Sequence, residues 1–405
     1  MNFISKYKIN IIVFFITLIS IYLLFPEYLY KYLVPIMAKN NQLFLFGDWS
    51  VIISAVDCKN MGLNVFIENP CDFIGREHVY GSLLLFIPYI KEFSKVYFFY
   101  FPIFVNILFI VIVTLHFDFT KFKNLFLFIF FIFNPSTLLI MERFNIDLLI
   151  LINVILISYF SSNYLRLLIV PLLTSIKFYP AILFNLFFLN TESSFKKSFL
   201  LLVISLMLAG IIIYWDIDNI IEILNNSHQF IAYDRYLFSL MSVPTYLNME
   251  SKFVLLLMFF IFFLYSYFIY YYLSNKITAL TDQNNEKINY NTILMLAGSG
   301  ILCATFFIFK NIYYREIFLF CALPYIIQQA NKHNVFEYLI YFIIFRYIFF
   351  LLSNGLSLHL GNHSLIFYKY ILDFMCVGFL FAIIIFEYSY IYKIYKKKIY
   401  DKKFW

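Results

Sequence analysis

Residues 253–273 read FVLLLMFFIFFLYSYFIYYYL and contain no charged residue, no glycine and no proline. An α-helix needs about 20 predominantly apolar residues to cross the hydrocarbon core of a bilayer. This stretch therefore predicts a transmembrane helix, and it is one of many such runs in the chain.

Apolar runs recur along all 405 residues, of which 63% are hydrophobic and 13% are charged. Soluble domains hold about 45–50% apolar and about 25% charged residues, so these values exclude water as the main solvent of this chain. We predict an all-α, polytopic membrane protein in which residues 1–405 form a single integral-membrane domain with about 12 transmembrane helices, two of them short. The expected spans are Ile9–Phe25, Val96–His116, Leu125–Ile140, Ile146–Phe160, Leu165–Ile176, Ala181–Leu189, Phe199–Tyr214, Phe253–Leu273, Thr292–Phe309, Ile317–Gln328, Val335–Leu352 and Tyr368–Tyr392.

Lysine clusters predict the orientation of these spans, because short loops rich in Lys and Arg stay in the cytoplasm. Only an arrangement with both termini in the cytoplasm places all the clusters on one side, with the basic tail 393–405 against anionic lipid. It requires 165–189 to be a hairpin that turns at residues 177–180, where Pro180 disfavours a continuous helix. The alternative is one long, tilted span with a buried Lys177. The clusters are Lys6/Lys8, Lys121/Lys123, Lys196/Lys197, Lys276/Lys287, Lys332 and the tail.

This orientation places a first loop, 26–95, and a second loop, 215–252, on the non-cytoplasmic side. The first loop is too short for a domain with a large core of its own, so we expect interfacial helices there. The charges that interrupt the apolar runs fall on the same side, and charges at membrane depth usually face one another or a cavity. The sequence therefore predicts a polar cavity that faces away from the cytoplasm.

Asp48 follows the apolar run 43–46 in the first loop and is a candidate general base. A carboxylate at the edge of the membrane can accept a proton from a reacting hydroxyl group. The alternative is structural: Asp48 caps a short helix that begins at Trp49, a role in which aspartate is common.

Cys58 and Cys71 share the first loop, where a disulfide between them would contribute roughly 3 kcal/mol on the oxidising side of a membrane. Their spacing matches no zinc pattern, and only His78 lies nearby. His359 and His363 have the spacing of a helical metal pair but no neighbouring carboxylate. We assign no metal ligands from the sequence.

Three of the cations on the predicted non-cytoplasmic side could surround one cavity: Arg143, Lys177 and Arg315. Arg143 stands beside Glu142 and Asp147, so one interpretation is an ion pair across a helix turn, with Asn145 as the cap. The other is that Arg143 faces the cavity and binds a phosphate through two hydrogen bonds. Each cation alone could reach toward the membrane surface. Three around one cavity favour an anionic ligand whose tail lies in lipid.

Three short motifs resemble the GT-C superfamily of integral-membrane glycosyltransferases, in particular its bacterial polyprenyl-phosphomannose-dependent mannosyltransferases. The order and spacing of the motifs also fit over about residues 5–350. Phe144 departs from the family's usual glycine and fills space near the proposed cavity. The motifs are Glu142-Arg143-Phe144-Asn145-Ile146-Asp147, which resembles Glu-Arg-Gly-Asn-x-Asp; Lys177-Phe178-Tyr179-Pro180, which resembles Lys-x-Tyr-Pro; and Tyr314-Arg315-Glu316-Ile317-Phe318-Leu319, which resembles Tyr-Arg-x-x-Phe-Leu.

The resemblance implies a GT-C-like fold and the transfer of a sugar from a polyprenyl-phosphate donor to a glycolipid or surface-glycan acceptor on the non-cytoplasmic face. The family's catalytic acid lies soon after the first span, where this chain has Asp48, and it would accept the proton of the acceptor hydroxyl. The three cations would stabilise the leaving phosphate. A divalent metal is left open and no other cofactor is expected. Supporting roles are predicted for Glu142, Asn145, Asp147, Arg76 and Tyr314.

The expected location is a bacterial inner membrane, with the sugar donor, the acceptor and membrane lipids as partners. The chain has no basic extramembrane domain that would indicate nucleic acid. An O-antigen-type polymerase is the first alternative, but it would carry arginine-rich motifs in two large external loops, and the second loop here holds only Arg235. A flippase or transporter of lipid-linked sugar would need charge distributed through the bilayer or access to both sides, whereas these charges cluster on one side. An interaction protein without a site leaves the cost of the clustered charges unexplained.

Overall fold

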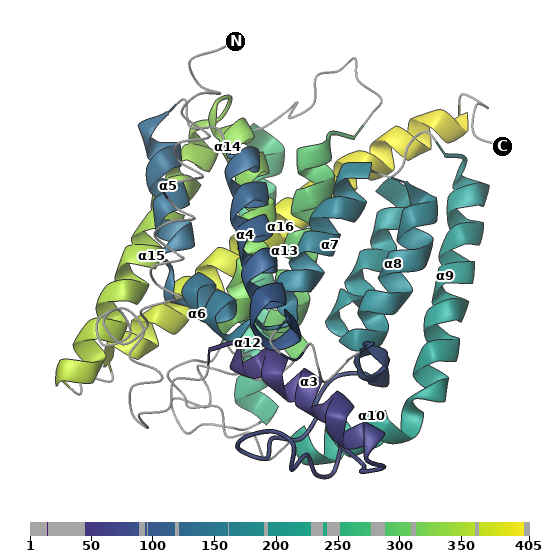
Figure 1. Ribbon diagram of the computed structural model, residues 1–405. Coiled ribbons are helices and arrows are strands. Elements are labelled where there is room, and N and C mark those ends of the chain that lie inside the picture. Colours follow the sequence, from purple (N-terminus) through teal and green to yellow (C-terminus); the bar gives the residue numbers. More distant parts are fainter. Residues whose placement is uncertain are drawn as a thin grey trace. The chain divides into compact units, whose positions relative to one another are not determined.

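The structure of the chain is a computed structural model that describes residues 14, 45–88, 94, 96–117, 121–160, 162–189, 193–227, 238–240, 252–276, 288–308, 313–360 and 364–400. The expected anchor 9–25 lies outside these residues except for Phe14. Helices joined by turns make up the described residues, with no strand among them (Figure 1). The predicted all-α class is confirmed.

Six helices of the described residues are long and apolar enough to cross a membrane, and each coincides with an expected span. Together with the composition they make this an all-helical membrane protein. The number of about 12 spans stays a prediction, because the remaining expected spans are shorter, bent or outside the described residues. The six are Val96–His116, Phe195–Trp215, Lys252–Lys276, Tyr290–Phe307, Asn334–Leu352 and Phe367–Lys393.

The expected span 125–140 is a pair of helices, α5 (Phe122–Ile132) and α6 (Pro135–Arg143), that are bent by 47° and count as a seventh span if taken together. Asn134 causes the break, because its side chain accepts a hydrogen bond from Ser136 N (2.7 Å) and caps α6. Pro135 then occupies the first helical position, where its missing N–H costs nothing.

The expected hairpin in 165–189 consists of α8 (Asn163–Ile176) and the 3₁₀ helix η5 (Tyr179–Leu189). The end of η5 lies against the beginning of α8: Asn163 Nδ2 donates to the carbonyl of Phe187 (3.3 Å), and the buried Arg166 donates to the carbonyl of Leu186 (2.5 Å). A single tilted span could not make these contacts, so the hairpin interpretation describes this segment.

The chain divides into two compact units, and three helices run through both. The first unit comprises residues 1–152, 172–178 and 209–231. Its first loop packs on a small core that includes Val56, Phe66 and Leu85, with Ile223 of α10 against it. Its remaining elements are α3 (Gly47–Asn60), η2 (Ser82–Phe86), the π-helical η4 (Val96–Tyr100), α4 (Phe101–His116), α5, α6 and α10 (Ile217–Ser227); the shared helices are α7 (Asp147–Phe160), α8 and α9 (Phe195–Trp215).

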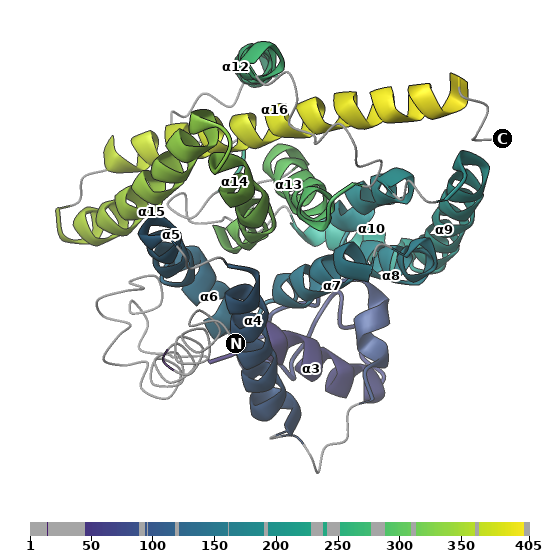
Figure 2. The ribbon, with the colours of Figure 1, turned by 90° about the horizontal axis from the view of Figure 1, so that it is seen from above.

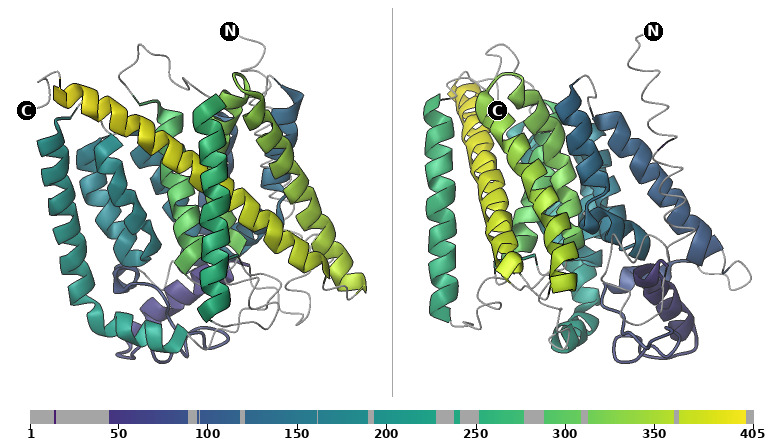
Figure 3. Two further views of the ribbon diagram at one scale, coloured as in Figure 1. Left: turned by 180° about the vertical axis from the view of Figure 1, so that it is seen from behind. Right: turned by 90° about the vertical axis from the view of Figure 1, so that its left-hand side faces the viewer.

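The second unit comprises residues 153–171, 179–208 and 232–405. Here α12 crosses α16 and packs against it (Figures 2 and 3), and α13 contacts η5, η7 and α16. Glycine permits two of these approaches, because a Cβ at Gly298 would lie 2.1 Å from Cys321 Cβ and one at Gly378 would lie 2.7 Å from the Tyr265 ring. The elements are α12 (Lys252–Lys276), α13 (Tyr290–Ile308), η7 (Tyr313–Ala322), α14 (Leu323–Ala330), α15 (Asn334–Leu360) and α16 (Ser364–Tyr400).

Candidate functional site

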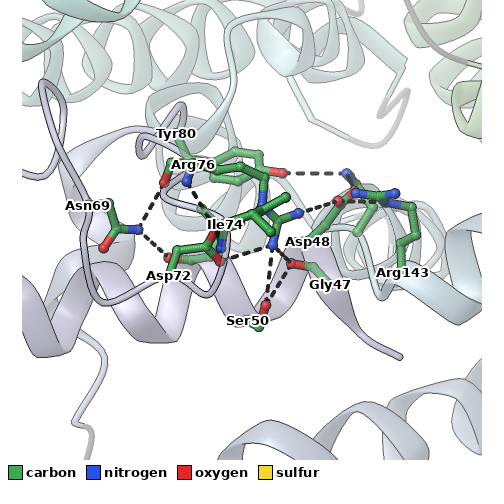
Figure 4. Close-up of polar contacts among 11 residues, drawn as sticks. Gly47, Asp48, Ser50, Asn69, Asp72, Ile74, Arg76, Tyr80 and Arg143 are labelled. Carbon is green, nitrogen blue, oxygen red and sulfur yellow. Dashed lines mark hydrogen bonds and ion pairs between the residues drawn. The ribbon is translucent and has the colours of Figure 1, made fainter. Parts of the chain in front are cut away.

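Asp48 lies in the first turn of α3 (Figure 4). Its carboxylate is held by Arg143, the last residue of α6, and by Asn145, which follows α6. Arg143 Nε donates to Asp48 Oδ1 and Asn145 Nδ2 donates to Asp48 Oδ2, each at 2.7 Å. The side chains of Asp48 and Arg143 are 13% and 23% exposed, so the pair is accessible from outside. The helix-cap alternative is not what the structure shows: Phe46 is the N-cap residue of α3, which has no side-chain cap hydrogen bond.

A second ion pair extends this cluster through Asn145. Lys177 Nζ donates to Asp147 Oδ1 and to Asn145 Oδ1 (3.2 Å), and it lies 5.1 Å from the centre of the Tyr80 ring. Asn145 Oδ1 also accepts from Asp147 N (3.1 Å), which fixes the orientation of the amide and starts α7. Asn145 is thus both the expected helix cap and the link between the two ion pairs.

Arg76 joins the first loop to the start of α3. It makes a two-pronged ion pair with Asp72, with Nε at 3.0 Å and Nη2 at 2.9 Å, and it donates to the carbonyl of Gly47 (2.8 Å). Its Nη1 lies 3.9 Å from Asp48 Oδ1, close enough to add positive charge beside that carboxylate. Figure 4 shows Arg76 and Arg143 reaching Asp48 from different elements. Arg76 therefore lies beside the Asp48 carboxylate, and its supporting role stays a prediction.

Two phenylalanines with left-handed backbone hold the chain on either side of the ion pair. Phe46 (φ 60°) precedes α3 and Phe144 (φ 46°) ends α6. Phe46 N donates to the carbonyl of Glu142 at 2.6 Å. Both rings are buried with their centres 6.2 Å apart, and the Phe144 ring also packs against Trp49. Left-handed geometry costs roughly 1–2 kcal/mol in a residue with a Cβ. Such strain is often found at functional sites.

The Phe144 ring packs among the rings of Phe46, Trp49 and Phe101. The left-handed backbone explains why a glycine would suit this position, and the aromatic cluster shows what offsets the strain here. Glu142 is buried, and its backbone carbonyl accepts the hydrogen bond from Phe46 N that connects the end of α6 to the start of α3.

The structure joins Cys58 and Cys71 in a disulfide that links the end of α3 to the first loop. Further along the loop, Gly81 N donates to the carbonyl of Ile176 (3.2 Å), one residue before Lys177. A Cβ at Gly81 would lie 1.9 Å from the Ser175 carbonyl oxygen, so only glycine fits there. This contact holds the end of α8 against the loop that carries Tyr80.

Arg315 and Tyr314 belong to η7 in the second unit. The Arg315 guanidinium lies 5.1 Å from the centre of the Tyr179 ring, so residues of two of the predicted motifs meet in this unit. The side chains of Tyr314 and His359, and residue His363, lie outside what the structure describes.

Sequence reasoning missed a buried charge cluster in the second unit. Arg346 of α15 donates to Glu316 of η7 and, through Nε, to Asp373 of α16 (2.8 Å). Lys369 lies one turn before Asp373, with its Nζ 3.8 Å from Asp373 Oδ2. All four side chains are buried. The signal was an arginine inside one apolar run and a Lys–Asp pair inside another.

The part of the chain that the structure describes holds no group of three His, Cys, Asp or Glu side chains placed to bind a metal ion. Comparison of the chain with protein-family models, with curated proteins and with solved structures found no match.

Proposed function

We propose that the protein is a glycosyltransferase that moves a sugar from a polyprenyl-phosphate donor to a hydroxyl of a glycolipid or surface-glycan acceptor. The observation that carries the proposal is the Asp48 carboxylate, held 2.7 Å from both Arg143 and Asn145 and still partly exposed. A fixed, accessible carboxylate beside cations is the arrangement that attack on a sugar phosphate needs.

Asp48 acts as the general base in this reaction. The acceptor hydroxyl oxygen attacks the anomeric carbon and forms the new glycosidic bond, while its proton passes to a carboxylate oxygen of Asp48. The bond between the anomeric carbon and the donor oxygen breaks, and polyprenyl phosphate leaves with the electron pair. Arg143 and Asn145 hold both carboxylate oxygens, so Asp48 needs no rearrangement before the proton moves.

Arg143 also stabilises the phosphate of the leaving group. A guanidinium carries five N–H donors, so one side chain can hold Asp48 through Nε and meet a phosphate through its other nitrogens. Lys177 adds a second positive charge, and Asn145 connects it to Asp48. Negative charge that develops on the departing phosphate is therefore met by cations that the fold has already positioned.

The test is sugar transfer in membranes that contain the wild type or Asp48→Asn, with radiolabelled polyprenyl-phosphate sugars and with total lipid and glycan extracts as acceptors. Asn keeps the shape of the side chain but cannot accept the proton, and we expect transfer to fall roughly 10²–10⁴-fold. Asp57→Asn is the matched control, because Asp57 lies in the same helix near its other end, and it should transfer sugar like the wild type.

Two further variants separate the base from a structural role. Asp48→Glu keeps the charge but moves the carboxylate by one methylene, so transfer should also fall although the ion pair with Arg143 can form. Arg143→Lys keeps the charge but loses the fork of donors, and transfer should again decrease. Equal transfer by the wild type and Asp48→Asn, at equal protein levels, contradicts the proposal. Movement of lipid-linked sugar without transfer would favour a flippase.

A further inference from the structure

The first unit contains a pocket at the other end of α3 from Asp48. It has a volume of about 320 Å³, within the range of small-molecule sites. Two aromatic rings form one side, Phe86 and Trp215, stacked with their centres 6.3 Å apart. They are 58% and 78% exposed, so both ring surfaces are open to a ligand. The polar lining consists of Lys59, Asn64, Ser82 and Asn219.

The surroundings of the pocket favour a neutral ligand over an anion. Lys59 Nζ lies 3.9 Å from the centre of the Phe86 ring, and it is the only cation in the lining. Asp216 accepts from Ser82 N (2.8 Å) and from Asn219 Nδ2 (2.6 Å), while Glu222 accepts from Asn64 (3.1 Å). Two carboxylates behind the polar lining would repel a phosphate.

Exposed rings next to amides and a hydroxyl match the chemistry of a sugar. The C–H face of a hexose ring can pack on an aromatic face, and its hydroxyls can bond to side-chain amides, to a serine and to an ammonium group. Asp216 also fixes the polar lining of the pocket, because it accepts hydrogen bonds from Ser82 N at the start of η2 and from the Asn219 side chain of α10. The pocket is therefore built to present several neutral hydrogen-bonding groups beside a stacking surface.

We propose that this pocket binds a neutral sugar unit of the acceptor. This inference rests on the proposed transferase function and names the class of acceptor, a glycan rather than a lipid that carries a single hydroxyl group. Residues 48 and 59 lie on one helix, about 16 Å apart at the rise of an α-helix. An acceptor held at Trp215 therefore has to extend along α3 to place its hydroxyl at Asp48.

The test uses purified full-length protein in lipid nanodiscs and saturation-transfer NMR with glucose, galactose, mannose, N-acetylglucosamine and their disaccharides at millimolar concentration. We expect the wild type to transfer saturation to the ring protons of at least one of these sugars. Trp215→Leu and, as a second variant, Phe86→Leu should weaken binding about tenfold, the effect of losing one stacking contact.

Tyr214→Leu is the matched control, because Tyr214 is the neighbouring residue and is 80% exposed but does not line the pocket. If Trp215 only anchors α9 at the membrane surface, Trp215→Leu and Tyr214→Leu bind sugar equally well, and the proposal is overturned. It is also overturned if no sugar of the panel binds to the wild type. Asp48→Asn should bind sugar like the wild type. Absence of sugar transfer by the wild type would therefore contradict the proposed function, whereas absence of sugar binding would contradict the proposed pocket.

Discussion

At the scale of single residues, Phe144 combines a destabilising backbone conformation with a stabilising buried ring. Its left-handed backbone (φ 46°) is strained, while its buried ring packs against Trp49 and Phe101. Phe144→Ala loses the ring and keeps the strain, which should cost about 3–5 kcal/mol of unfolding free energy. Phe144→Gly loses the ring but relieves the strain, so it should be about 1 kcal/mol more stable than the alanine variant. Denaturation in detergent ranks the two, and a more stable alanine variant would contradict the left-handed backbone.

His78 makes the first loop sensitive to acid. Its imidazole is buried between the rings of Phe66 and Tyr80, and burial lowers its pKa from 6.5 to about 4. Between these values the unfolded chain binds a proton that the folded loop does not, so stability falls as the pH decreases from 6.5 to 4. About 2 kcal/mol should be lost between pH 7 and pH 5.

The variant His78→Phe should lack this part of the pH dependence, because its ring cannot be protonated. Thermal unfolding of both proteins at pH 7 and pH 5 measures the loss of stability in each. Subtracting the loss in His78→Phe from the loss in the wild type removes the contribution of carboxylates that titrate in the same range. Identical losses in the two proteins would show that His78 is solvated rather than buried.

At the scale of elements, Arg346 connects η7, α15 and α16. Arg346→Met leaves Glu316 and Asp373 as buried carboxylates without their shared cation, which should cost about 3–5 kcal/mol. Adding Glu316→Gln removes one of these charges and leaves Asp373 with Lys369 at 3.8 Å. The double variant should therefore be more stable than Arg346→Met. Unfolding in detergent tests this, and additive losses would show that the three charges are not coupled.

The elements also show how far the sequence could predict this protein. Six long spans follow from hydropathy, because an uncharged run as long as 253–273 is expected in a membrane-spanning helix and not on a surface exposed to water. The break between α5 and α6 depends on the hydrogen bond from Ser136 N to the Asn134 side chain, which the hydropathy of the segment does not reveal. The approach of Asp48 to Arg143 joins residues 95 apart and depends on the strained turns at Phe46 and Phe144, which no local pattern indicates. Motif spacing could place both residues on one side, but only packing could make them a pair.

At the scale of the whole molecule, the predicted orientation connects the disulfide with the proposed reaction. Cys58 and Cys71 are bonded, and disulfides persist outside the reducing cytoplasm. The first loop also carries Asp48, so the disulfide and the candidate base must share one side of the membrane. The basic segments around Lys332 and in the tail 393–405 belong on the other side if the positive-inside rule holds.

Fusions to reporter proteins in a bacterial host test this orientation directly. Alkaline phosphatase, which is active only outside the cytoplasm, should be active when fused after Gly75 and inactive after Lys332 or Trp405. Green fluorescent protein should give the opposite pattern. Phosphatase activity after Trp405 would place the C-terminus outside and contradict the lysine pattern. Fluorescence after Gly75 would place Asp48 in the cytoplasm, where the disulfide would be reduced and the base would face away from any external acceptor.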